Sequence, residues 1–141
     1  MSGQHQFCTF YLGDLFFGIE VHKVQEVLRH QHMTEVPTSD SVIGGLINLR
    51  GQIVIAMDLR RRLGLPERSS SDSPMNVVVR CHDGAVSLLV DHIGDVVEVE
   101  DDTFECPPDT LAGEGRKLIQ GVHKLKTELL HVLDAEKVLA A

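Results

Sequence analysis

The sequence predicts an all-β protein with short helices, built as two small β-barrel lobes. Apolar runs of strand length, rich in Val, Ile and Leu, alternate with turns that contain Gly and Asp. Branched aliphatic side chains must form most of the core, because the chain has five Phe, one Tyr and no Trp. The chain also aligns with itself, and two similar halves of four or five strands each indicate two lobes.

The composition is that of one compact globular unit. With 141 residues, of which 43% are hydrophobic and 24% charged, the chain is long enough to bury a sizeable core. We expect a single domain over residues 1–141, with repeat halves at about 7–65 and 76–139. Neither half offers much core alone, so the lobes are expected to share strands or to pack face to face.

The first elements are two strands and a helix. Residues 7–12 and 15–19 are apolar runs on either side of a Gly-Asp turn, which predicts a hairpin. Apolar residues then recur at helical spacing, which predicts a short helix over residues 21–28.

The central stretch, residues 42–65, predicts a second hairpin followed by a capped helix. Arg50-Gly51 separates two apolar runs, and Gly51 can take the positive φ that a tight turn needs. Asp58 stands where a helix N-cap belongs, and Gly64 stands where a left-handed residue commonly ends a helix.

The second half repeats this order. A loop over residues 66–74 precedes it, residues 107–115 are irregular, and Asp134 is placed to cap a last helix at residues 135–139. The predicted strands are residues 76–81, 85–90, 96–99, 118–125 and 128–133.

Two alignments carry the predicted repeat. Residues 45–58 align with residues 121–134 at an offset of 76, and residues 7–27 align with residues 76–96 at an offset of 69. The first alignment places the helix cap Asp58 over Asp134, and the second places one hairpin over another. Identities are few, so chance similarity is the alternative that a structure has to exclude.

Charge and cysteine usage limit the classes of function. The net charge is −8, and the one basic cluster, Arg60-Arg61-Arg62, is flanked by acidic residues, which disfavours nucleic acid as a partner. Cys8, Cys81 and Cys106 are far apart and form no CxxC motif, which favours reduced thiols and a reducing compartment. We found no signal peptide and no apolar stretch of about 20 residues, so we expect a cytosolic protein without direct membrane insertion.

The sequence contains no convincing active site, so we expect a protein that binds and does not catalyse. Eight histidines invite a metal hypothesis, and His30 with His32, or His123 with His131, could lie on shared faces. No four ligands show the spacing of a structural zinc site, however, and no Gly-rich phosphate loop or activated nucleophile is present. We therefore predict no catalytic residue, no metal and no cofactor.

Residues 36–65, VPTSDSVIGGLINLRGQIVIAMDLRRRLGL, resemble the central signature of the CheW family, adaptors that couple the histidine kinase CheA to chemoreceptors. GLINLRGQIV with the following Asp-Leu-Arg carries most of the resemblance. It extends to IEVHKVQEVL at residues 19–28 and to VSLLVDHIGDVVEV at residues 86–99, and it covers nearly the whole chain. The resemblance implies two five-stranded, OB-like barrels that exchange strands.

The same resemblance implies partners and binding residues. A CheW-type protein binds the regulatory domain of a CheA-type histidine kinase and the cytoplasmic tip of methyl-accepting chemoreceptors, and it lies in the cytoplasm at receptor arrays. Glu26 and Arg50 match the family's Glu and Arg of the receptor-binding region. The candidates for an apolar receptor patch beside them are Val24, Val27 and Val86, for which a plain core role is the alternative. The candidates for the kinase face are Met33, Val36 and Ile43.

Three other functions are compatible with a fold of this kind, and each would need features of its own. The regulatory domain of a kinase would need ATP-binding and phosphorylatable His domains before the first strand, and a receiver-fused relative would need a doubly wound domain after Ala141. An OB-like nucleic-acid module would need a basic, aromatic groove. The sequence favours the adaptor over all three.

Overall fold

The computed structural model describes residues 4–29, 31–36, 41–66, 73–81, 84–100, 104–105 and 114–139. Some features predicted from the sequence therefore lie outside the described residues: His30, most of the 66–74 loop, the turn residues 82–83, Cys106 and most of the 107–115 segment.

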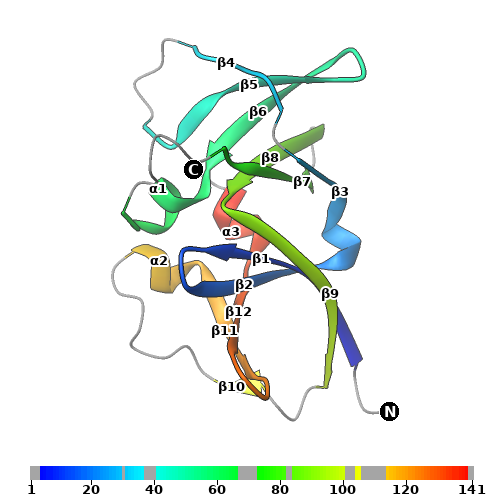
Figure 1. Ribbon diagram of the computed structural model, residues 1–141, viewed down its shortest axis with the longest axis vertical. Helices are drawn as coiled ribbons and strands as arrows, with labels where there is room; N and C mark the ends of the chain where they lie inside the picture. The colour runs from blue at the N-terminus through cyan, green and yellow to red at the C-terminus, as the bar shows by residue number, and fades with distance from the viewer. Residues whose placement is uncertain are drawn as a thin grey trace.

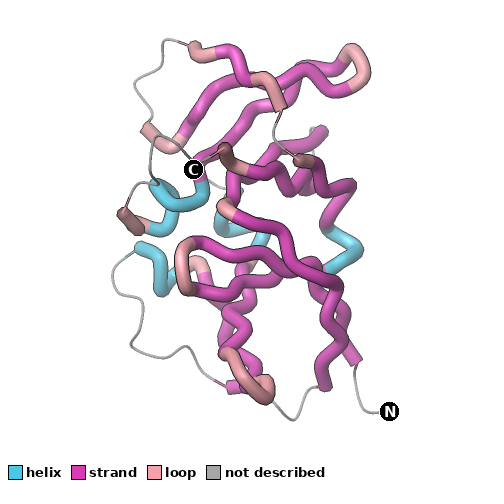
Figure 2. Tube along the Cα trace, viewed as in Figure 1, coloured by secondary structure: helices cyan, strands magenta, loops and turns pink. Residues whose placement is uncertain are grey.

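Strands dominate the described chain, and the helices are short (Figures 1 and 2). In the first half the elements are β1 (Gln4–Leu12), β2 (Leu15–Glu20), the 3-10 turn η1 (Val21–Lys23), β3 (Val24–Leu28), β4 (Met33–Thr34), β5 (Ile43–Leu49), β6 (Gln52–Asp58) and α1 (Leu59–Leu63). In the second half they are β7 (Met75–Cys81), β8 (Gly84–Val90), β9 (His92–Glu100), β10 (Phe104–Glu105), α2 (Glu114–Lys117), β11 (Ile119–Lys124), β12 (Leu129–Leu133) and α3 (Ala135–Leu139).

The described strands form two sheets, one in each lobe. Lobe I, the lower lobe in Figure 1, has the strand order β10-β11-β12-β2-β1-β9, and lobe II, the upper lobe, has the order β3-β7-β8-β6-β5-β4. The prediction of an all-β fold in two lobes is confirmed. Each sheet contains six strands by backbone pairing, where five were expected, because the two-residue strands β10 and β4 add to one edge of each.

The lobes exchange strands, as predicted. Hairpin β1–β2 of the first half pairs with strands of the second half, and hairpin β7–β8 of the second half pairs with strands of the first. Each exchanged hairpin joins its sheet through a parallel pairing, β2 with β12 and β8 with β6. Neither lobe can therefore form from one half of the chain alone.

The two halves have the same strand pairings in the same register. The amide of Asp58 donates to the carbonyl of Val42 at 2.7 Å, and 76 residues later the amide of Asp134 donates to the carbonyl of Leu118 at 2.8 Å. A β-bulge interrupts hairpin β5–β6 and hairpin β11–β12 at the same step. The pairs that flank these bulges are Ile43–Met57 and Gly45–Ala56 in one hairpin, and Ile119–Leu133 and Gly121–Val132 in the other. We propose on this ground that the halves near residues 7–65 and 76–139 are two copies of one unit within a single domain.

The helix predicted over residues 21–28 is wrong. The chain makes one 3-10 turn at Val21–Lys23 and then enters strand β3, which pairs antiparallel with β7. A bulge between Val24 and Glu26 adds one residue to the strand, so the apolar residues no longer alternate strictly and their spacing imitates a helix. Backbone hydrogen bonds to β7 therefore stabilise this segment as a strand and not as a helix.

The local predictions for the central stretch agree with the structure. Arg50 and Gly51 both have positive φ, 52° and 86°, as a two-residue hairpin turn of the primed type requires. The carboxylate of Asp58 accepts from the amides of Arg60 and Arg61 at 3.0 and 3.4 Å, and Gly64 ends α1 with φ 74°.

The largest hydrophobic cluster lies between the lobes. This interlobe core contains Phe10, Phe17 and Leu133 of lobe I, and Met57, Val79 and Leu88 of lobe II, all buried. Smaller clusters fill each lobe, around Phe7 and Leu130 in lobe I and around Ile47 and Val54 in lobe II. The two lobes thus share their main core.

Candidate docking site

Arg50 and Glu26, which are 24 residues apart in the sequence, form a bidentate ion pair. Nη1 and Nη2 of Arg50 donate to the two carboxylate oxygens of Glu26 at 2.7 and 3.0 Å. The hairpin tip that carries Arg50 is held by the side chain of Asn48, which accepts from the amide of Gly51 at 2.9 Å. The Glu26 side chain is 17% exposed and the Arg50 side chain 77% exposed, so the guanidinium presents a rigidly placed cation to solvent.

One face of the lobe II sheet carries the predicted apolar residues. Ile55 lies opposite Val86, Val86 opposite Val79, and Val79 opposite Val24, which places these side chains in one row across four strands. Val24 and Val86 are half-buried against the interlobe core, so each contributes to the core and also keeps some accessible surface. Val27, in the neighbouring row, is exposed.

The same face includes two residues that the sequence analysis missed. Ile53 is 61% exposed and Ile55 is 43% exposed, although both belong to the apolar strand β6. In a strand with apolar residues on both faces, alternation cannot tell which face is covered, and so the sequence contained no signal for them. We call Val24, Val27, Ile53, Ile55 and Val86 the docking face.

The candidate kinase-binding residues lie at another edge of lobe II. Met33 is on β4, and Ile43 begins the neighbouring strand β5. Met33, Val36 and Ile43 are all half-buried, and Met33 packs against the cluster inside lobe II. Strands β4 and β3 are the two ends of the sheet order, but the sheet curls, because Met33 lies opposite Ile47 near the hairpin tip whose Arg50 contacts Glu26 of β3.

The histidines do not assemble into a metal site in the described part of the chain. His123 and His131 belong to paired strands, but His123 lies opposite Leu130 and His131 opposite Val122, so the two do not face each other. The ring of His123 packs on Phe7, and Nδ1 of His131 contacts the carbonyl of Phe16 at 2.9 Å. Among the described residues, no group of three or more His, Cys, Asp or Glu side chains is placed to hold a metal ion.

A polar hollow of about 420 Å³ opens beside η1. Its lining comes from β1, the end of β2, η1 and β9, and consists of His5, Gln6, Glu20, Val21, His22 and Glu98. The imidazole of His22 lies 3.2 Å from the Glu20 carboxylate at its rim. The titratable groups in its lining are thus two histidines and two glutamates.

The two described cysteines are free thiols that lie partly buried in strands, as their sequence context indicated. Burial raises the pKa of the Cys8 thiol above its ordinary value, which keeps the thiol protonated and unreactive near neutral pH. None of the helices in the described residues is long and apolar enough to cross a membrane.

The fold and this geometry define a two-lobed β-sheet module in which lobe II carries a half-exposed apolar face. The family described as the CheW-like domain matches residues 6–141. The chain is 30% identical to the chemotaxis protein CheW of Treponema pallidum over 98% of this chain and 84% of that one. It is 32% identical to the chemotaxis protein CheW of Bacillus subtilis over 87% of this chain and 79% of that one.

The fold is likewise similar to a solved structure. The scaffolding protein TtCheW from Thermoanaerobacter tengcongensis superposes with a TM-score of 0.85 over 99% of this chain and 94% of that one, at 23% sequence identity. The chain described here belongs to the CheW-like family.

Proposed function

We propose that this protein is a chemotaxis adaptor that couples a CheA-type histidine kinase to methyl-accepting chemoreceptors. Membership of the CheW-like family supports this role, as do relatives named chemotaxis protein CheW and a structural neighbour named a scaffolding protein. The observation that carries the proposal is the Arg50–Glu26 ion pair in the same lobe as a half-exposed apolar face, in a chain of this family.

The docking face and the ion pair together receive the receptor. An amphipathic helix of a receptor hairpin presents an apolar stripe, and Ile53, Ile55 and Val27 offer exposed apolar surface for it. Glu26 directly precedes Val27 on β3 and points to the other side of the strand, so the Arg50–Glu26 pair forms a polar rim at the edge of this surface and orients the helix through its polar flank. The pair itself contributes only about 0–1 kcal/mol to stability because the Arg50 side chain is largely exposed, so its value lies in recognition.

The regulatory domain of the kinase binds at the β4 edge, through Met33, Val36 and Ile43. These residues belong to β4, β5 and the segment between them, whereas the docking face belongs to β3, β6 and β8, so the two partners use different strands and can be held at the same time. The protein then acts by holding the kinase and the receptor at a fixed position and orientation relative to each other. In this role the protein works in the cytoplasm at receptor arrays, without a cofactor, without catalysis, and without contact with nucleic acid or insertion into the membrane.

Calorimetric titration tests both partners separately. In one titration a coiled-coil fragment of a chemoreceptor tip is added to the protein. In a second titration the isolated regulatory domain of a CheA-type kinase is added to the protein. We expect both to bind, Ile55→Ser to weaken receptor binding about tenfold, and kinase binding to stay unchanged. The matched control is Val96→Ser, an exposed valine at the lobe I position equivalent to Val27. Equal loss in both variants, or unchanged receptor binding by Ile55→Ser, contradicts the proposed face.

A further inference from the structure

The chain passes between the two sheets at two places in its described part. It leaves lobe I at the end of β2 and enters lobe II through η1 and β3, and it returns through Asp91, the one residue between β8 and β9. The two passages are equivalent in the repeat, since Asp91 lies 69 residues after His22 of η1. They are held by very different contacts.

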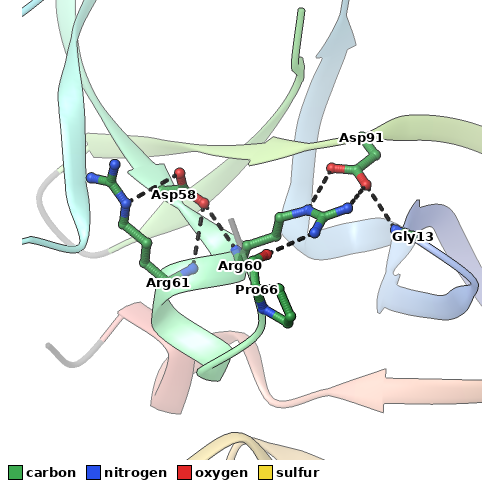
Figure 3. A network of polar contacts seen from close by, with 6 residues as sticks. All are labelled: Gly13, Asp58, Arg60, Arg61, Pro66 and Asp91. Atoms are coloured by element: carbon green, nitrogen blue, oxygen red, sulfur yellow. Dashed lines mark hydrogen bonds and ion pairs between the residues drawn. The ribbon is translucent and has the colours of Figure 1, made fainter. Parts of the chain in front are cut away.

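At the second passage, Asp91 is the centre of a polar network between the lobes (Figure 3). Its carboxylate accepts from Nε of Arg60 at 3.0 Å and from Nη2 of the same side chain. It also accepts from the amide of Gly13, in the β1–β2 turn of lobe I, at 2.7 Å. Nη1 of Arg60 donates to the carbonyl of Pro66 at 2.7 Å, which fixes the guanidinium on the lobe II side.

The side chains of this network are shielded from solvent. Arg60 and Asp91 are each 14% exposed, and the amide of Asp91 donates to the carbonyl of Tyr11 at 3.1 Å. A charge pair that is bidentate, shielded and completed by neutral hydrogen bonds resists displacement more than an exposed pair does. We call Arg60, Asp91 and Gly13 the interlobe clamp.

At the first passage, the ion pair is formed by the neighbour of the equivalent residue, and it is exposed. Glu136 stands 76 residues after Arg60, and its carboxylate lies 3.6 Å from Nζ of Lys23 of η1. The Glu136 side chain is 82% exposed, so this pair is strongly screened by solvent. Nη1 of Arg80 also donates to the carbonyl of His22 at 3.1 Å, at an exposed position. One passage between the lobes is therefore held by a shielded clamp, and the other by exposed contacts.

The weakly held passage leads directly into the docking face. Val24 follows η1 without an intervening residue, and Glu26 and Val27 come next on the same strand. Val24 and Val86 are half-buried against the interlobe core, so the angle between the lobes decides how much of each is available to a partner. A residue that sets this angle can change receptor binding without touching the receptor.

We propose that Arg60 and Asp91 are positioning residues that hold the lobes at the angle at which the docking face is open. The clamp fixes the second passage between the lobes. Any change in the angle between the lobes is then taken up at the first passage, by η1 and the start of β3, where the receptor binds. The inference rests on the proposed function for its binding consequence. Its structural consequence, a fixed lobe angle that depends on Asp91, stands independently.

The test measures lobe orientation and binding in the full chain. Residual dipolar couplings of backbone amides report the orientation of each lobe, and one alignment tensor should fit both lobes of the unaltered protein. Asp91→Asn removes the charge and replaces one acceptor by a donor that faces Arg60. We expect the two lobes of this variant to need different tensors, and its affinity for the receptor-tip fragment to fall about tenfold.

Two controls separate positioning from general damage. Glu136→Gln removes the equivalent exposed pair and should leave the couplings and both affinities unchanged. Binding of the kinase regulatory domain, proposed to lie within lobe II, should persist in Asp91→Asn and shows that the lobe is folded. If Asp91→Asn does not fold, Arg60→Lys, which keeps the charge but loses the bidentate geometry, should show the same changes at reduced size.

The outcomes are distinct. A single tensor and unchanged receptor affinity in Asp91→Asn would overturn the proposal, as would weakened receptor binding at an unchanged lobe angle. If the unaltered protein does not bind the receptor fragment, the proposed function fails, and the dipolar couplings alone still decide whether the clamp sets the lobe angle.

Discussion

The two lobes have the same backbone pairings but present different side chains at equivalent positions. In lobe II the hairpin tip carries Arg50, which pairs with Glu26 of the edge strand. In lobe I the same two positions hold Lys126 and Asp95, and among the described contacts these two form no ion pair. The tip of lobe I is instead tied to β1, where the hydroxyl of Tyr11 donates to the Glu128 carboxylate at 3.2 Å.

The contrast extends to the sheet faces. Ile55 of lobe II is half-exposed, whereas the equivalent residue of lobe I, His131, is buried against the ring of Phe17. A repeated backbone therefore does not imply a repeated surface. Lobe I uses this position to complete the core, and lobe II leaves it open, which is why we assign docking to one lobe only.

The largest expected effect comes from replacing the two equivalent residues, Ile55 of lobe II and His131 of lobe I, each by alanine. His131→Ala should cost roughly 2–4 kcal/mol of unfolding free energy, because it opens a cavity beside Phe17 and removes the contact with the carbonyl of Phe16. Ile55→Ala should cost less than about 1 kcal/mol, since much of this side chain is already in water. Denaturant unfolding measures both. Similar costs at the two positions would show that Ile55 is a core residue and would remove it from the docking face.

A second test concerns the glycine that follows the bulge in lobe II. A Cβ at Gly45 would come within 2.6 Å of both Met33 Cγ and the backbone oxygen of Thr34, so Gly45→Ala must displace β4. We expect a loss of about 1–3 kcal/mol of stability together with weaker binding of the kinase domain. At Gly44 a Cβ would meet the end of the Leu89 side chain at 3.0 Å, which can move, so Gly44→Ala is the milder control. If Gly45→Ala binds the kinase normally, the β4 edge is not its site.

Most of the fold was predictable because its signals are local. Gly51, Asp58 and Gly64 each have a conformational role that depends on near neighbours, and each has that role in the structure. The segment at residues 21–28 was misread because a bulge is fixed by the partner strand β7, which the sequence does not show.

The candidate site was predictable only in part, for a related reason. Arg50 and Glu26 could be named through a family pattern, and the structure shows that they touch. Ile53 and Ile55 could not be named, because their exposure depends on how far lobe I extends over the face of lobe II. The partnership of Arg60 with Asp91 was hidden for the same reason, as it joins segments 31 residues apart across the two lobes.

Alanine at the two hairpin tips tests whether the lobes differ in recognition. Arg50→Ala should change stability by less than about 0.5 kcal/mol, because the side chain is largely exposed, but it should weaken receptor binding and receptor-coupled kinase activation. Lys126→Ala should change neither. A double-mutant cycle of Arg50→Ala with Glu26→Ala, read as receptor affinity, should show coupling between the two groups. Normal kinase activation by both single variants in reconstituted arrays would refute the assignment.

The smallest expected effect lies at the tip of lobe I, where Tyr11 meets Glu128. Burial raises the pKa of Tyr11, and the hydrogen bond and negative charge of Glu128 raise it further. The folded state thus favours the neutral phenol. This contribution to stability is complete below the ordinary pKa of tyrosine and is lost as the pH rises through the raised value.

Glu128→Gln should lower the Tyr11 pKa toward its ordinary value without reaching it, because burial remains. Ultraviolet absorbance of tyrosinate reports this residue alone, since the chain contains one tyrosine. Glu136→Gln, on the distant helix α3, should leave the titration midpoint unchanged. Receptor affinity should be the same in both variants, because this tip closes lobe I and does not dock a partner. A receptor defect in Glu128→Gln equal to that of Arg50→Ala would show that both tips bind, and the functional distinction between the lobes would then be wrong.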